Sequence, residues 1–172
     1  MTVSSSHSRG LELFKKLGAA DADSWAEREE ESPALARWLF LTGLWRCVDA
    51  DDDGEWMESW ENDDDPIPRA IRRMLDHGID PEDLTAVVRD MQIAALHAVC
   101  LLIDRSDHGI EDLQAKLPEI VEWRLAEYDG NHGQLGRAVE DLHEEFHDFD
   151  PTGRRGQPRR RSRRPRGTRD PG

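Results

Sequence analysis

Five residues near the end of the chain, His143-Glu144-Glu145-Phe146-His147, have the HExxH spacing of zinc hydrolases. Two histidines four residues apart lie on the same face of a helix, where both imidazoles can bind one zinc ion. The glutamate between them, Glu144, would then act as general base on a zinc-bound water. The motif therefore makes His143 and His147 candidate metal ligands and Glu144 a candidate catalytic residue.

The surroundings of this motif favour a simpler interpretation. A catalytic zinc usually takes a third protein ligand from a later part of the chain. Here Pro151 follows within four residues of the motif, and only an arginine-rich tail comes after it. Glu145 and Asp148 add further charge to the same helix. We expect a solvated acidic helix face with two exposed histidines, and a zinc-dependent hydrolase is the alternative.

A second pattern, Asp49-Ala50-Asp51-Asp52-Asp53-Gly54, matches the first half of a calcium-binding EF-hand loop. Acidic side chains occupy loop positions one, three and five, and Gly54 occupies the position of the sharp turn. The twelfth position is Trp60, where a bidentate glutamate is needed, and Glu61 comes one residue late. An acidic surface loop is the preferred interpretation, with calcium binding as the alternative.

The same acidic stretch contains two tryptophans four residues apart, which would form one aromatic patch on a short helix. Aromatic anchors inside a charged rim are typical of a protein interface, here for a basic partner, or of a mimic of nucleic-acid charge. In the alternative, both indoles pack onto the core, as we expect for Trp38 and Trp45. The candidate interaction residues are Asp51, Asp52, Asp53, Trp56, Trp60 and Glu61.

Charge divides the chain into an acidic body and a basic tail. The 172 residues carry a net charge of −14, but residues 153–172 contain nine arginines and one aspartate, which leaves −22 for residues 1–152. An anionic body repels DNA and anionic lipid and attracts basic proteins or cations. The tail either folds back over the body or binds phosphate backbones non-specifically. The second case predicts a nucleic-acid accessory protein acting through Arg159, Arg160, Arg161, Arg163 and Arg164.

Compartment follows from the apolar segments and the cysteines. The first ten residues have no apolar signal core, and the longest apolar run, 93–103, is about half of what a bilayer requires. Cys47 and Cys100 stand among apolar residues without paired spacing. We expect a cytoplasmic protein with no membrane contact and two buried free thiols, a disulfide being the alternative. His97, within the apolar run, is expected to be a buried core histidine.

The elements that must position these residues are mainly helical. Hydrophobic spacing and caps predict helices that end at Gly18, that span 24–31 with Ser24 as N-cap, and that run from Pro33 to about Val48. Further helices are predicted from Pro66 to Gly78, from the N-cap Asp80 to Ile103, and over 138–149. On the central helix one buried face is expected to contain Leu84, Val88, Met91, Ala95, Val99 and Leu102, with Ile93, Leu96, Cys100 and Ile103 beside it.

Residues 120–137 fit a strand pair as well as a helix, because polar and apolar residues alternate before the turn sequence DGNHG. The expected fold is all-α or mainly α, an irregular bundle of five to six helices with a possible short β-hairpin near 120–137. The length suits one domain. We expect a loose N-terminus over 1–9, an acidic helical domain over 10–152 and a disordered tail over 153–172.

The segments WRLAEYDGNHG and LHEEFHDFDPTG resemble the closing third of a set of uncharacterised bacterial proteins that share an LHE segment and a DPTG ending. This resemblance implies no activity. The excess of arginine over lysine, 20 against 3, also indicates a GC-rich bacterial genome. The sequence as a whole favours a non-enzymatic protein, of a regulatory or toxin-neutralising type, whose acidic surface engages a basic partner.

Overall fold

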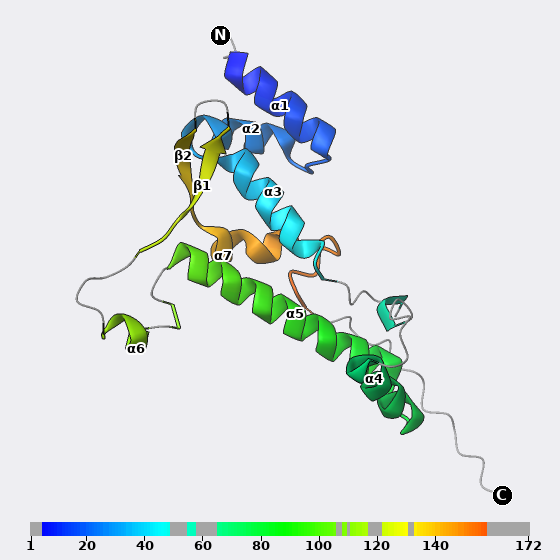
Figure 1. Cartoon of the computed structure of the whole chain (residues 1–172). Coiled ribbons are helices and arrows are strands. Elements are labelled where there is room, and N and C mark those ends of the chain that lie inside the picture. Colours follow the sequence, from blue (N-terminus) through cyan, green and yellow to red (C-terminus); the bar gives the residue numbers. More distant parts are fainter. Residues whose placement is uncertain are drawn as a thin grey trace, which may run out of the picture.

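The computed structural model describes residues 5–48, 55–57, 65–105, 108–109, 111–116, 122–130 and 133–157. These residues form a mainly helical fold with one two-stranded hairpin, which confirms the predicted fold class (Figure 1). The elements are α1 (Ser5–Leu17), α2 (Ala22–Glu31), α3 (Ala34–Trp45), η1 (Glu55–Met57), α4 (Pro66–Asp76), α5 (Pro81–Asp104), α6 (Glu111–Gln114), β1 (Leu125–Asp129), β2 (Gln134–Val139), α7 (Leu142–Glu145) and η2 (Phe146–Phe149).

The caps explain where several helices begin and end. Gly18, at a φ of +81°, ends α1 as predicted, because glycine enters the left-handed region without steric cost. Asp80 caps α5 by accepting a hydrogen bond from the Glu82 N–H at 2.9 Å. The predicted cap of α2 is wrong by three residues. Asp21, not Ser24, supplies the accepting carboxylate, and Ser24 donates its backbone N–H at 3.3 Å.

The hairpin replaces part of the last predicted helix. β1 and β2 pair antiparallel, with Leu125 opposite Val139. The prediction of a helix from Ala138 is therefore wrong, since Ala138 and Val139 belong to β2 and helical structure starts at Leu142. Val139 is buried in the core, and a buried β-branched residue suits a strand. At the other end of the chain, α1 starts at Ser5, inside the stretch expected to be loose.

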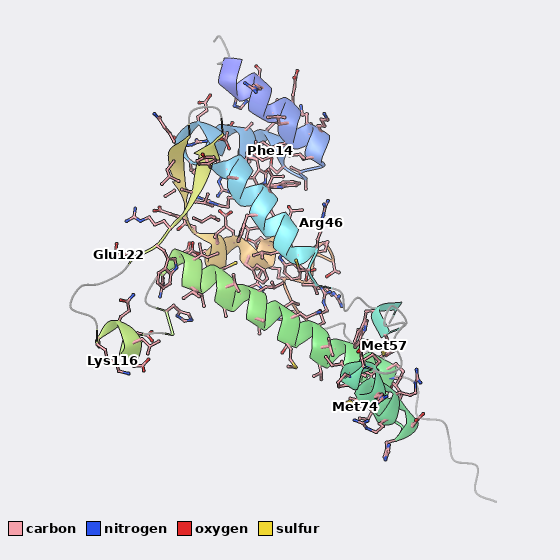
Figure 2. All side chains as sticks on the ribbon, in the orientation of Figure 1. Phe14, Arg46, Met57, Met74, Lys116 and Glu122 are labelled. Carbon is pink, nitrogen blue, oxygen red and sulfur yellow. The ribbon has the colours of Figure 1, made fainter. Side chains whose placement is uncertain are left out.

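The buried side chains form three clusters. One lies between α3, α5, α7 and the hairpin, and consists of Leu41, Trp45, Ile93, Cys100, Val139, Leu142 and Phe146. Another joins α1, α2 and α3 around Phe14 (Figure 2) and includes Ala22, Ala26 and Ala34. A third joins η1, α4 and α5 through Trp56 and Ile71. The long helix α5 thus contributes to two of the three clusters.

The buried face of α5 differs from the predicted one. Thr85, Arg89, Ile93 and Cys100 are buried, whereas 67% of Met91 is exposed. Val99 and Leu102, also assigned to the buried face, are exposed as well. The helix is apolar around its whole circumference, so hydrophobic spacing alone does not select the side that meets the core.

Among the described residues, α5 is the one helix whose length and composition would let it cross a bilayer, with a mean hydropathy of 1.7 over its most apolar window. Of that window, 17% is buried within the protein. One such helix is weak evidence for a membrane span, because the core helices of soluble proteins can have the same length and composition.

The two cysteines are both free thiols, but only one is buried. Cys100 lies in the main core, as expected. Cys47 is exposed at the end of α3, where its Sγ lies 3.5 Å from the carbonyl oxygen of Gly43. The prediction of two buried thiols is therefore wrong for Cys47, because Arg46 and Cys47 lie on the exposed side of the turn after α3 while Val48 returns to the core.

Candidate functional site

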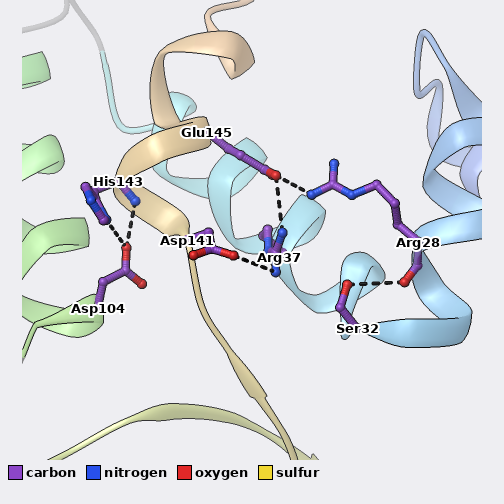
Figure 3. A network of polar contacts seen from close by, with 7 residues as sticks. All are labelled: Arg28, Ser32, Arg37, Asp104, Asp141, His143 and Glu145. Atoms are coloured by element: carbon purple, nitrogen blue, oxygen red, sulfur yellow. Dashed lines mark hydrogen bonds and ion pairs between the residues drawn. The ribbon is translucent and has the colours of Figure 1, made fainter.

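The HExxH residues lie where the hairpin runs into α7 and η2, against α5 (Figure 1). His143 is held by Asp104 at the end of α5. One carboxylate oxygen of Asp104 accepts the backbone N–H of His143 at 2.8 Å and lies 2.6 Å from its Nδ1 (Figure 3). The α-helical turn ends at Glu145, and a 3-10 turn carries His147. The two histidines therefore do not share the regular helix face that the motif predicts.

His147 instead lies beside His97 of α5. The two ring centroids are 5.1 Å apart at an interplanar angle of 30°, and the ring of Phe146 contacts both. His97 is half-buried, so the expectation of a buried core histidine is met only in part. Burial and, next, the charge of a protonated His147 lower the pKa of His97.

The two glutamates of the motif point to different surroundings. Glu144 is exposed, whereas Glu145 is partly buried and contacts Arg28 of α2 and Arg37 of α3 (Figure 3). His143 and His147 are also partly buried, so the prediction of two exposed histidines on a solvated face is wrong. Within the described ranges, no three His, Cys, Asp or Glu side chains are grouped so as to hold a metal ion.

Buried Arg37 and exposed Arg137 connect the elements around this region through ion pairs. Arg37 is buried, and its Nη1 donates to the Glu145 carboxylate at 3.2 Å. Arg137 of β2 joins the hairpin to α2, because it reaches Glu29 at 2.5 Å and Glu127 at 3.0 Å. The hydrogen bond with Glu127 makes the largest contribution to raising the pKa of Arg137. The hydrogen bond with Glu29 raises this pKa further, although burial opposes the shift. Each contact is charge-assisted, and those of Arg37 with Glu145 and of Arg137 with Glu29 link elements far apart in the sequence.

Asp150, the first residue of the DPTG segment, is fully enclosed. Its carboxylate accepts hydrogen bonds from Arg89 at 3.1 Å, from the N–H and hydroxyl of Thr152 at 2.9 and 2.6 Å, and from the N–H of Gly156 at 2.8 Å. Burial by itself would raise the pKa of Asp150, but these hydrogen bonds and the charge of Arg89 outweigh it and lower the pKa. The segment 150–157 is therefore fixed over α5, past the boundary at 153 predicted for the tail.

A groove of about 630 Å³ lies between α5 and the segment 150–157. His97 and His147 line it together with Asp90, Arg154 and Arg155. Gly156 packs closely against His147 of the histidine pair, since a Cβ at that position would come within 2.9 Å of the His147 Nδ1. Nothing in the spacing of the sequence brings His97 to the HExxH motif, so sequence reasoning missed this pair.

Of the six candidate interaction residues, only Trp56 is among those that the structure describes. Asp51, Asp52, Asp53, Trp60 and Glu61 lie outside the described residues, as does the loop with EF-hand spacing. Trp56 is described and is 6% exposed. Its indole N–H donates to the Thr85 hydroxyl at 3.0 Å, and the ring packs against Ile71. Trp56 thus follows the alternative in which the indole folds onto the core, and it is no exposed anchor.

The start of the basic tail contacts the body of the same chain. Arg155 pairs with Asp148 at 2.5 Å, and Arg154 donates to the Thr152 hydroxyl at 2.9 Å. Arg159, Arg160, Arg161, Arg163 and Arg164 lie outside the described residues. For the first two arginines, the arrangement is that of a segment folded back on its own domain.

Comparisons of this chain with models of protein families, with curated protein sequences and with solved structures find no match.

Proposed function

We propose that this chain is a non-enzymatic cytoplasmic interaction protein whose acidic surface engages a basic partner protein, in a regulatory or toxin-neutralising role. The observation that carries the proposal is the separation of charge. Residues 1–152 have a net charge of −22, and a body of that charge attracts cationic surfaces over several ångströms of solution.

The internal contacts support this proposal because they leave carboxylates at the surface. Four arginines of the body are engaged within the fold, since Arg28, Arg37, Arg89 and Arg137 each pair with a carboxylate of the same chain. On α2 and at its N-terminal end, by contrast, the exposed side chains include Asp21, Asp23, Glu27, Glu30 and Glu31. A basic partner would therefore meet an excess of solvated negative charge, which favours fast association and partner selection.

The zinc-hydrolase alternative has less support from the geometry. His143 is committed to Asp104, His147 lies beside His97, and Glu144 points into solvent. The nucleic-acid alternative depends on arginines outside the described residues, while Arg154 and Arg155 contact the body itself. An interaction protein requires neither a metal centre nor a free tail.

The test is affinity capture from native lysate with the full chain as bait. We expect one main partner with a basic isoelectric point, released as the salt concentration is raised. Replacing Asp51, Asp52 and Asp53 with asparagine should abolish capture. The matched control removes three exposed charges from α2 by Asp23→Asn, Glu27→Gln and Glu30→Gln. It should slow association but retain the partner, because α2 contributes long-range attraction and the proposed contact is made by Asp51, Asp52 and Asp53.

Three results would contradict the proposal. They are a main partner with an acidic isoelectric point, a capture that neither salt nor the Asp51, Asp52 and Asp53 substitutions reduce, and a capture of nucleic acid alone. The last result, if lost on truncation after Thr152, would favour the accessory role of the tail.

A further inference from the structure

The side of α5 that faces away from the core is apolar. Val87 is 57% exposed, Met91 67% and Leu102 36%, and Ala94 and Ala98 are exposed between them. At 100° per residue these five positions follow one line along the helix, opposite Arg89, Ile93 and Cys100 of the buried face. We call Val87, Met91, Ala94, Ala98 and Leu102 the outer stripe.

A helix that is hydrophobic all round normally lies in an interior. In Figure 1, α3 and α7 lie on one side of α5, α4 lies at its N-terminal end, and α6 stands apart near its C-terminal end. Between these two ends the outer stripe stays exposed. An exposed apolar strip of this length is typical of an interface. It extends about 22 Å from Val87 to Leu102 at 1.5 Å per residue.

The charges at the two ends of the outer stripe are opposite. Asp83 is exposed at the N-terminal end, one turn before Val87, and Arg105 is exposed at the C-terminal end, one turn after Leu102. If the same helix from a second copy lay antiparallel, Asp83 of each copy would approach Arg105 of the other. A two-fold axis makes this contact twice. A parallel arrangement would place like charges together, and a uniformly basic partner helix would meet Arg105.

The side-chain sizes along the outer stripe are complementary under the same symmetry. With the axis between Ala94 and Ala95, Met91 lies opposite Ala98 of the second copy, and Val87 lies opposite Leu102. The alanines at the centre let the two backbones approach closely. A groove of about 360 Å³ lies beside Val87 and Met91, and its other walls are Ala86, Arg89, Asp90 and Gly156 of the segment 150–157. In the proposed arrangement the Leu102 side chain of the second copy lies at the mouth of this groove.

We propose that α5 is a homodimer interface, in which the outer stripes of two copies pack antiparallel about a two-fold axis between Ala94 and Ala95. This inference does not depend on the proposed function, since the acidic surface of α2 and the dimer face are separate. A dimer would carry two acidic bodies and so present a basic partner with twice the charge.

The first test measures oligomeric state by sedimentation velocity of the full chain over a range of micromolar concentrations. We expect a dimer that Met91→Glu converts to a monomer with an unchanged helical circular-dichroism spectrum. Leu135→Glu is the matched control, because Leu135 is 78% exposed on β2 and should leave the dimer intact. A wild-type chain that remains monomeric throughout this range would overturn the proposal, as would a dimer that Met91→Glu leaves unchanged.

The second test uses charge reversal to fix the orientation of the two helices. Asp83→Arg and Arg105→Asp should each weaken the dimer about tenfold at low salt, because each turns two attractions into two repulsions. The double variant should return to within about threefold of the wild-type dissociation constant. If the double variant loses as much dimerisation free energy as the two single variants together, the antiparallel pairing is excluded.

The third test is disulfide trapping in a Cys47→Ser background, which removes the exposed thiol. Ala94→Cys lies next to the two-fold axis and should give a disulfide-linked dimer on oxidation, while the exposed control Ala20→Cys should not. Vesicle binding tests for a different occupant of the outer stripe. Binding of phosphatidylcholine vesicles through the outer stripe, lost in Met91→Glu while the free chain is monomeric, would overturn the dimer in favour of a lipid surface.

Discussion

The guanidinium of Arg89 meets the carboxylate of Asp150 at 3.1 Å, across 61 positions of sequence, with both side chains enclosed by the protein. This pair fixes the DPTG segment to the middle of α5. Thr152 and Gly156 complete the hydrogen bonds of the same carboxylate, so that a buried charge is fully satisfied. The DPTG segment therefore has a structural role in this chain.

Replacing Asp150 with asparagine should destabilise the protein by about 3–5 kcal/mol, because Arg89 would remain buried without its charge partner. Urea unfolding followed by tryptophan fluorescence measures this loss. The control is Asp148→Asn, since Asp148 is exposed and pairs with exposed Arg155, and surface pairs contribute less than about 1 kcal/mol. Equal effects of the two substitutions would show that Asp150 is not the brace described above.

His97 should make stability fall on acidification. Its pKa in the folded protein is below the ordinary value of 6.5, so the unfolded chain binds the proton more tightly. The free energy of unfolding should therefore decrease as the pH falls below about 6.5, and level off below the pKa of the folded state. In His97→Gln the decrease between pH 7.5 and 5 should be smaller, as measured by urea unfolding at each pH.

The matched control for His97 is His77→Gln, because His77 is exposed beyond the end of α4. Its pH profile should follow that of the wild type. A His97→Gln profile with the same slope as the wild type would mean that another group causes the acid sensitivity.

The two thiols should differ sharply in reactivity. Burial, and next the negative charge of Asp104, raise the pKa of Cys100 to about 12, so that almost no thiolate forms at pH 8. Cys47 is exposed at the end of α3. Ellman's reagent should therefore label one thiol in the native chain, none in Cys47→Ser, and two after denaturation. Rapid native labelling of Cys47→Ser would show that Cys100 is accessible.

The neighbouring glutamates of the HExxH motif should differ in how much their loss of charge lowers the stability of the fold. Glu145→Gln should destabilise the fold by about 2 kcal/mol, because buried Arg37 loses a charged hydrogen-bond acceptor. Glu144→Gln should change little, since Glu144 is exposed. Thermal unfolding of both variants measures the difference. A larger loss in Glu144→Gln would instead indicate that this residue has partners within the fold.

The sequence predicted the helical elements well where local chemistry decides them. Gly18 and Asp80 mark helix ends through backbone and cap preferences that need no tertiary context. The hairpin was predicted as one of two alternatives, because alternation over five residues competes with helical spacing. The prediction of a helix start at Ala138 was wrong, because the burial of Val139 depends on α3 and α5, which lie far away in the sequence.

The site depends on contacts that no local pattern encodes. Arg37 and Arg89 are buried and paired, and arginine is usually an exposed residue, so composition gave no signal for either of them. The pairing of His97 with His147 arises from the packing of η2 on α5. The sequence left open whether Trp56 is an exposed interface anchor or packs on the core. The Thr85 hydroxyl, which accepts the indole hydrogen bond, favours the packed position.

The cluster of Trp56 and Ile71 is separate from the other two, which meet where the ring of Trp25 lies 5.5 Å from that of Phe149, and this arrangement bears on how the protein opens. The cluster of Trp56 and Ile71 packs on Leu84 and Val88 in the N-terminal half of α5, whereas the pairs of Arg37 with Glu145 and of Arg89 with Asp150 lie around the main core. Amide hydrogens of α4 should therefore exchange with solvent sooner than those around Phe146. The end of the molecule next to the acidic stretch can unfold locally while the braced core stays closed.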